Sequence, residues 1–243
     1  MMTVNLKGNS RHSIGPDRDG GRMQPLPSPA HRPRSVLIID DHDIVRFGLE
    51  TLVHGCRELQ LAGSADSLAA GLRIIEAAQP DLVISDMGTR DSSGLDTVRS
   101  VVAAQAPRPV LIVSIHDEML YGEQVIALGA RGYLMKENAH ASVIPASLAI
   151  LNGDTWVSPR LNAKLVNRMF RFAGHTHGRG ASLSLSSREL EVLELLKSGK
   201  STKEIAKTME VSVRTVDIHR SRLKRKLGLR TGAELIAFAS SRL

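Results

Sequence analysis

The sequence predicts an α/β fold with a five-stranded, doubly wound parallel sheet, followed by a small all-α domain of four helices. Between residues 35 and 152, short apolar segments alternate five times with helical patterns, an order typical of parallel sheets covered on both faces. The charge also changes sign along the chain. Residues 35–150 carry 8 Lys and Arg against 15 Asp and Glu, a net charge of −7, whereas residues 185–243 carry 13 against 7, a net charge of +6. Two modules with different partners are therefore expected.

The strands of the sheet are expected where short runs of Val, Ile and Leu occur, because strands buried on both faces are apolar throughout. These runs predict strands at residues 35–39, 59–64, 81–85, 109–114 and 131–135. The segments between and after them have helical periodicity. They predict helices at residues 43–54, 67–78, 93–105, 118–128 and 139–151.

Two segments outside these modules have the composition of extensions and linkers. Residues 1–34 are rich in Gly, Pro, Ser and Arg, so we expect a disordered N-terminal extension. Residues 153–184 are expected to form a linker with a short basic helix at 160–171. His175 and His177 lie in its Gly-rich part, where solvated linker is a better interpretation than a metal site.

The last block, residues 185–243, predicts four short helices. Ser186 followed by Glu189, and Ser201 followed by Glu204, are two capping boxes that each open a helix. The first helix should bury Leu190, Leu193 and Leu196, and the second Ile205 and Met209. A third helix is expected from Val213 to Leu227, with an apolar stripe formed by Val213, Val216, Leu223 and Leu227. A fourth should follow from Gly232.

Composition excludes several classes of protein. Cys56 is the only cysteine, so no intrachain disulfide can form; we expect a reducing, cytoplasmic setting and a buried, apolar role for Cys56. No apolar run approaches 18 residues, which predicts no membrane span. Residues 1–34 have no apolar central region and do not fit a secretory signal. The basic last block points to a polyanion such as nucleic acid.

Polar residues follow four of the predicted strands. Because ligands of parallel sheets bind at the carboxyl ends of the strands, these residues should share one crevice. They are Asp40, Asp41, Asp86, Ser114 and Lys136. Three carboxylates suit Mg²⁺, with Asp41 and Asp86 as direct ligands and Asp40 acting through water, while Lys136 and Ser114 could contact phosphoryl oxygens. A single Asp at a strand end is more often a helix cap, but four suitable strand ends favour a site.

The residues around this crevice resemble the receiver domain of bacterial response regulators, which has a flavodoxin-like fold. The matching segments are Ile39-Asp40-Asp41-His42, residues 80–86, Val113-Ser114 and residues 129–136. The resemblance implies that Asp86 accepts a phosphoryl group from the phosphohistidine of a sensor histidine kinase. It also implies that Ser114 and Tyr133 form a switch pair and that the Gly88 carbonyl binds the metal.

One segment departs from that family. The family usually has Met-Pro three and four residues after the phosphoacceptor, where this chain has Thr89 and Arg90. Loss of proline should leave the loop less restrained, with consequences for phosphoryl lifetime or kinase choice.

The basic block has the arrangement of a helix-turn-helix, whose second helix enters the major groove. Residues 185–193, 203–206 and 215–228 resemble the LuxR-type DNA-binding domain, and the two modules together resemble response regulators of the NarL/FixJ type. The expected DNA-binding residues are Lys203, Arg214, Thr215, Asp217, Ile218, His219, Arg220, Ser221, Arg222, Lys224 and Arg225. Asp217 stands where family members often have Lys, so Asp217, Ile218 and Ser221 should influence sequence preference.

The sequence thus predicts a phosphorylation-controlled transcription regulator that binds DNA as a dimer, with a sensor kinase and RNA polymerase as further partners. Two alternatives remain open. An Mg²⁺-dependent phosphohydrolase would need a second carboxylate two residues after the nucleophile, where this chain has Gly88. A receiver that signals without phosphorylation is compatible with Thr89 and Arg90, although Asp40, Asp41 and Lys136 argue against it.

Overall fold

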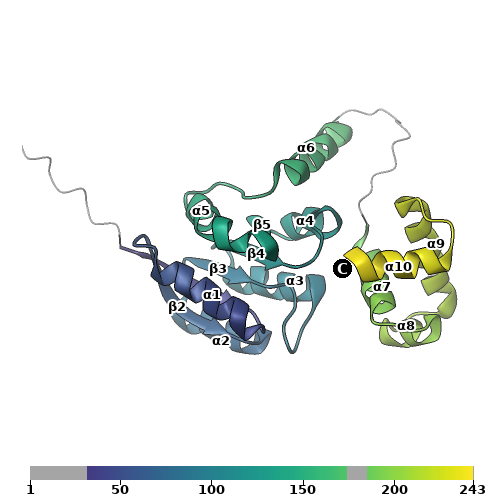
Figure 1. The fold of residues 1–243 in the computed structure, drawn as a ribbon, viewed down its shortest axis with the longest axis horizontal. Helices are drawn as coiled ribbons and strands as arrows, with labels where there is room; N and C mark the ends of the chain where they lie inside the picture. Colours follow the sequence, from purple (N-terminus) through teal and green to yellow (C-terminus); the bar gives the residue numbers. More distant parts are fainter. Residues whose placement is uncertain (1–31, 174–184, 243) are drawn as a thin grey trace, which may run out of the picture. The chain divides into compact units, whose positions relative to one another are not determined.

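The structure is a computed structural model that describes residues 32–173 and 185–242. Figure 1 shows a sheet with its helices and a further group of helices in the C-terminal part of the chain. Of the disordered extension expected over residues 1–34, residues 1–31 lie outside the described residues, as does the tether with His175 and His177, whereas Arg34 is already the first residue of a strand. The proposed domain boundaries therefore stay predictions.

The sheet has five parallel strands in the order β2-β1-β3-β4-β5, which confirms the predicted fold class. The strands are β1 (Arg34–Ile39), β2 (Leu59–Ala65), β3 (Leu82–Ser85), β4 (Val110–Ser114) and β5 (Gly132–Met135). Each bound lies within one residue of its prediction. In this order β1, β3, β4 and β5 are consecutive neighbours, so their carboxyl ends form one edge.

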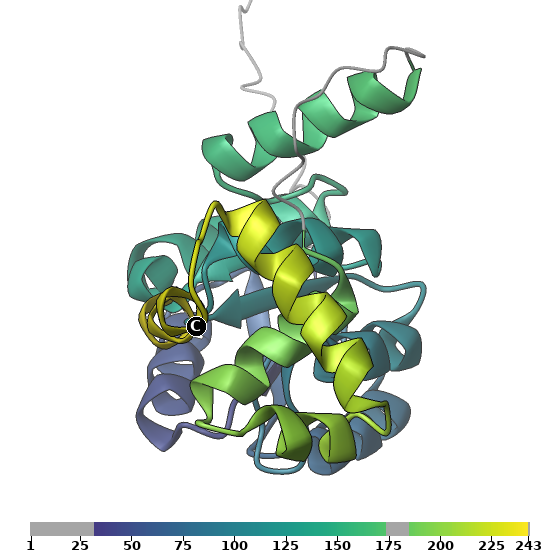
Figure 2. The ribbon, with the colours of Figure 1, turned by 90° about the vertical axis from the view of Figure 1, so that its right-hand side faces the viewer.

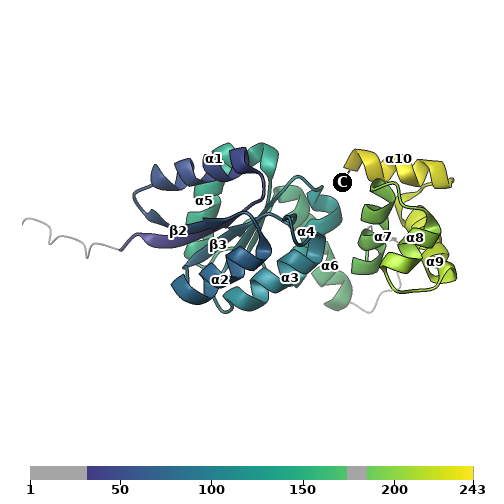
Figure 3. The same cartoon turned by 90° about the horizontal axis from the view of Figure 1, so that it is seen from below.

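Helices cover both faces of the sheet, α1 and α5 on one and α2, α3 and α4 on the other (Figure 3). They are α1 (Asp43–His54), α2 (Leu68–Ala78), α3 (Gly94–Gln105), α4 (Glu118–Ala127) and α5 (Ala139–Leu151). Successive residues of a strand point to opposite faces of the sheet. Val36 and Ile38 pack with α1 and α5, whereas Leu37 and Ile39 pack with the other helices.

The helix after the sheet, α6 (Pro159–Ala173), packs on α4. Leu161 is fully buried, and its side chain lies against Gly122 so closely that a Cβ added there would come within 2.4 Å of it. Glu123 of α4 is 3% exposed and pairs with two cations of α6, Lys164 at 3.4 Å and Arg168. The predicted short basic helix is therefore fixed to α4 by an apolar contact and a buried carboxylate.

The C-terminal part contains α7 (Ser187–Lys197), α8 (Thr202–Thr208), α9 (Val213–Leu227) and α10 (Gly232–Arg242). In Figure 2, α9 is the long yellow-green helix and α10 is seen end-on beside the C label. Both predicted capping boxes form: Ser186 accepts from the Glu189 N–H, and Ser201 accepts from the Glu204 N–H. Each Glu side chain accepts from the backbone of its Ser in return.

The core of these helices contains nearly all the predicted apolar residues. Leu190, Leu193, Leu196, Ile205, Met209, Val216 and Leu223 are buried, and Leu227 is partly buried. Val213 has the spacing of the predicted stripe but is 42% exposed. It is the first residue of α9, directly after the Ser212 cap.

Cys56 also differs from its prediction. It is only partly buried, because it follows the end of α1 in an exposed turn, and its thiol lies 3.3 Å from a Glu58 carboxylate oxygen. Burial raises the pKa of the Cys56 thiol, and Glu58 adds to that effect, so this thiol is poorly suited to ionise.

Candidate phosphoacceptor and DNA-binding sites

The carboxyl edge of the sheet brings two carboxylates onto one ammonium group. Lys136 follows β5, and its Nζ lies 2.6 Å from Oδ2 of Asp86 after β3 and 2.8 Å from Oδ2 of Asp40 after β1. The three side chains are 9%, 5% and 1% exposed. The two carboxylates lie close together because β3 pairs in parallel with β1 and the two strands end level with one another.

The charges of this cluster do not balance. With Asp41 at 23% exposure beside it, three carboxylates face one ammonium, a net charge of −2. Burial raises the pKa of Asp86, and the neighbouring Asp40 raises it further, against the opposing effect of Lys136. Burial alone would lower the pKa of Lys136, but its ion pairs with Asp40 and Asp86 outweigh this and raise it. An additional divalent cation would neutralise the cluster.

The donor set fits Mg²⁺. Ligand atoms of Asp40, Asp41, His42 and Asp86 all lie within 4.8 Å of one another. Oδ2 of Asp40 and Oδ1 of Asp41 are buried and accept no well-aligned hydrogen bond from the described residues, although Lys136 Nζ lies 2.8 Å from the first and His42 Nδ1 lies 2.8 Å from the second. Carboxylate oxygens are the ligands that Mg²⁺ prefers. His42 was missed in the sequence, although its position directly after the acid pair was a signal; its Nδ1 lies 2.8 Å from Asp41.

The predicted switch residues lie at the ends of the next two strands. Ser114 is fully buried, and its Oγ accepts a hydrogen bond of 3.2 Å from the His116 N–H. Tyr133 is 1% exposed and is therefore buried. Its hydroxyl donates to the His116 carbonyl at 2.8 Å, and burial raises its pKa far above the ordinary value. Both side chains therefore hold the loop between β4 and α4.

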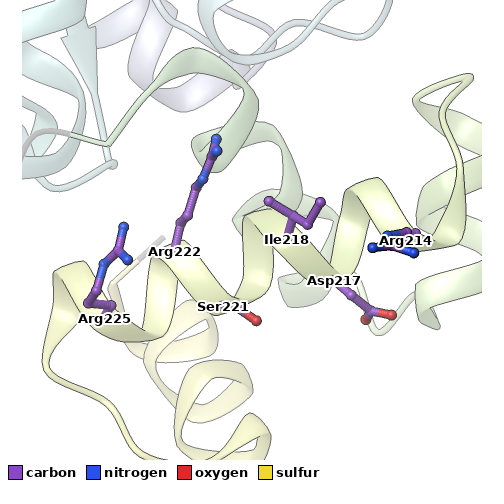
Figure 4. Close-up of a pocket in the computed structure, with 6 residues that line it drawn as sticks. All are labelled: Arg214, Asp217, Ile218, Ser221, Arg222 and Arg225. Carbon is purple, nitrogen blue, oxygen red and sulfur yellow. The ribbon is translucent and has the colours of Figure 1, made fainter.

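Six side chains, all polar except Ile218, project from α9 (Figure 4). Arg214, Asp217, Ile218, Ser221, Arg222 and Arg225 line one shallow hollow of the surface. They fall at positions 214, 217 and 218, 221 and 222, and 225, and steps of three or four residues keep them on one face of the helix. The face opposite contains Val216 and Leu223, which are buried, so the hollow points away from the core. Six of the eleven predicted DNA-binding residues are thus brought together.

The other five predicted residues lie elsewhere. Lys203 is exposed on α8. Thr215 bonds to the Ser212 cap, with its N–H 3.1 Å from the Ser212 Oγ. Arg220 donates to the Thr202 hydroxyl at the start of α8, which fixes it between the two helices. His219 and Lys224, both on α9, are partly buried.

Lys226, among the cations of α9, forms an ion pair within the fold. Its Nζ lies 2.6 Å from Oε2 of Glu189 on α7. The Glu189 side chain is 3% exposed, and it also belongs to the first capping box. Burial alone would raise the pKa of Glu189, but Lys226 and Ser186 hold it below the ordinary value. Lys226 therefore links two helices within the fold.

Comparison with known proteins defines the class. Residues 36–146 match the response regulator receiver domain family, and residues 183–239 match the bacterial regulatory proteins of the luxR family. The chain belongs to the response regulators of the NarL/FixJ type, which join these two domains. None of the described helices has both the length and the apolarity needed to cross a bilayer.

Its curated relatives include the oxygen regulatory protein NreC of Staphylococcus carnosus, 31% identical over 211 residues, with 84% of this chain and 95% of NreC covered. NreC of Staphylococcus aureus strain RF122 is also 31% identical over 211 residues. The same fold occurs in RcsB of Salmonella enterica serovar Typhimurium bound to the promoter P1flhDC with the phosphomimetic BeF₃⁻. That structure has a TM-score of 0.67 at 23% identity, covering 86% of this chain and all of RcsB.

Proposed function

We propose that this response regulator accepts a phosphoryl group on Asp86 and, in that state, binds promoter DNA as a dimer. The observation that carries the proposal is the position of Lys136 between Asp86 and Asp40 at the carboxyl edge of the sheet. A buried ammonium beside the acceptor carboxylate is suited to a phosphoryl group, which brings negative charge to a site that already contains three carboxylates.

The transfer would move a phosphoryl group from a phosphohistidine of a sensor histidine kinase to Asp86. The N–P bond breaks, an Oδ–P bond forms to give an acyl phosphate, and the histidine nitrogen keeps the bonding electron pair. Lys136 would pair with one phosphoryl oxygen, and the Ser114 hydroxyl would donate to another. Lys136 must leave Asp86 Oδ2 for this, and it can keep its contact with Asp40 while doing so.

Asp41, Asp86 and the Gly88 carbonyl would hold Mg²⁺ directly, and Asp40 would act through water. Bound there, Mg²⁺ would neutralise the repulsion between the carboxylates and the incoming phosphoryl group. Without a metal, the three carboxylates and one ammonium carry a net charge of −2, which a divalent cation would neutralise.

The switch would run through Ser114 and Tyr133. In the structure Ser114 accepts from His116, and Tyr133 donates to the same residue. If the Ser114 hydroxyl turned toward the phosphoryl group, its bond to His116 would change. The bond between Tyr133 and the same loop would then rearrange as well. Phosphorylation would thereby shift the receiver toward an active arrangement that exposes its dimer surface.

The C-terminal domain would place α9 in the major groove. Arg214, Arg222 and Arg225 would contact phosphates, and Asp217, Ile218 and Ser221 would meet base edges. The remaining contacts would come from Lys203, Thr215, His219, Arg220 and Lys224. RcsB dimers bind DNA, and a dimer of this chain would read two half-sites about one helical turn apart. Such a regulator acts in the bacterial cytoplasm, with RNA polymerase as a further partner.

The test uses the purified full chain with radiolabelled acetyl phosphate and Mg²⁺. We expect label on wild type and none on Asp86→Ala, together with tighter binding of selected DNA after phosphorylation. A wild type that takes no label but still selects a DNA sequence would replace this proposal with the alternative, a receiver that signals without phosphorylation. Binding-site selection with and without beryllium fluoride would identify the operator.

A further inference from the structure

The loop after the phosphoacceptor is fastened to a neighbouring helix by Asp91, which directly follows the Thr89 and Arg90 that this chain has in place of the usual Met-Pro. The N–H groups of Leu68 and Ala69, at the start of α2, donate to the two carboxylate oxygens of Asp91 at 2.8 and 3.0 Å. The residue that precedes the helix, Ser67, makes no capping bond. A side chain 23 residues away therefore caps α2.

Further bonds make the loop rigid from within. The Thr89 N–H donates to the Ser92 carbonyl at 2.8 Å, and the Thr89 hydroxyl donates to Asp91 Oδ1 at 3.0 Å. The Thr89 end of this bond is 9% exposed, whereas Asp91 is exposed. Arg90 adds an ion pair of 2.9 Å with Asp66, just before α2. Side-chain bonds therefore restrain this loop, although it lacks the proline whose loss was predicted to leave it less restrained.

The helix that receives these bonds is itself held close to the site. Gly71 of α2 lies against Ile39, the last residue of β1, so closely that a Cβ at position 71 would come within 2.4 Å of the Ile39 side chain. Asp40 and Asp41 follow Ile39 directly. Contacts thus run without a break from the acid pair through α2 to Asp91. Three residues before Asp91 is Gly88, whose carbonyl is expected to bind the metal.

We infer that Asp91 is a positioning residue for the metal site, acting through the loop on the Gly88 carbonyl and supported by Thr89. The inference rests on the proposed function, because it assigns Asp91 a role in the same metal-binding reaction. Removing the Asp91 carboxylate frees the loop from α2, and the Gly88 carbonyl then has to be ordered when the metal binds. Residues that orient a metal ligand typically contribute tenfold or more to affinity.

The experiment measures the Mg²⁺ dissociation constant of the unphosphorylated full chain by isothermal titration calorimetry. We expect Asp91→Ala to raise it about tenfold. Asp91→Asn keeps one acceptor oxygen and should have a smaller effect in the same direction. The matched control is Asp96→Ala, which removes an exposed carboxylate from the first turn of α3 whose bond is to Arg99. It should bind Mg²⁺ like wild type.

A second readout keeps the inference testable if Asp91→Ala does not fold. Thr89→Val preserves the side-chain shape and removes only the hydroxyl, which donates to Asp91 and to the Ser92 carbonyl within the same loop, so it should also weaken Mg²⁺ binding. Equal Mg²⁺ affinities for wild type, Asp91→Asn and Thr89→Val would overturn the role of Asp91, and so would an equal loss in Asp96→Ala. A wild type that binds no Mg²⁺ would instead count against the proposed function.

Discussion

Lys136 holds Asp86 by an ion pair of 2.6 Å, so the expected phosphoacceptor is bound to a cation before any phosphoryl group arrives. The same ammonium lies 2.8 Å from Asp40, and both carboxylates are almost fully buried. The resting site is therefore a buried ion cluster with an excess of negative charge. Its stability and its affinity for a divalent cation are two aspects of the same electrostatics.

The first prediction concerns this ammonium. Lys136→Met removes the ammonium that pairs with two buried carboxylates, so the free energy of unfolding should fall by about 3 kcal/mol in the absence of Mg²⁺. Millimolar Mg²⁺ should restore part of the loss, because it supplies positive charge at the same place. Urea denaturation of wild type and Lys136→Met with and without Mg²⁺ measures this. An equal Mg²⁺ effect on both proteins would contradict the prediction.

The second prediction concerns the ion pair between α7 and α9. The folded protein holds the pKa of Glu189 below its ordinary value of 4.5, through Lys226 and Ser186 and against the effect of burial. A carboxyl with a lowered folded pKa contributes stability that is present above the ordinary value and lost as pH falls through the folded value. The melting temperature of the C-terminal domain should therefore drop on acidification below 4.5.

Calorimetry of the full chain at a series of acidic pH values measures that drop. Lys226→Met and Glu189→Gln should each flatten it, since the first removes a cause of the low pKa and the second removes the titrating group. An acid dependence that is as steep in both variants as in wild type would show that other carboxyls are responsible.

The third prediction concerns sequence preference. Asp217 lies on the exposed face of α9 between Arg214 and Ser221, and a carboxylate there can accept a hydrogen bond from cytosine N4 but cannot hold a phosphate. Asp217→Lys should change the sequence recovered in a binding-site selection. Arg222→Ala should instead weaken binding to all sequences and reduce the salt slope by about 1. Recovery of an unchanged sequence with Asp217→Lys would refute the assignment.

The fourth prediction concerns the attachment of α6. Glu123 is 3% exposed and meets Lys164 and Arg168, so Glu123→Gln keeps the shape and removes the charge that fixes both cations. Hydrogen exchange at residues 159–168 should become about tenfold faster, as expected for loss of one hydrogen bond to a charged group. Glu76→Gln, an exposed change on α2, is the matched control. Equal exchange rates in all three proteins would argue against this role for Glu123.

The sequence by itself determined the sheet, its flanking helices and the residues of the carboxyl edge. Strands buried on both faces are apolar throughout, and the chain marks each strand end with a polar residue, so periodicity located Asp40, Asp86 and Lys136 within one residue of the strand ends. The two capping boxes are equally local, because their partners are three residues apart.

Tertiary structure alone decided which side chains meet across long separations. Asp91 caps α2 from 23 residues away, and Lys226 bonds to Glu189 from 37 residues away. No periodicity encodes such pairs, because they depend on how helices and loops are placed on the sheet or on each other. Val213 likewise has the spacing of a core residue but is 42% exposed, because burial depends on what packs against that position. Local sequence patterns determine the helices and strands, and tertiary packing determines which distant side chains contact one another.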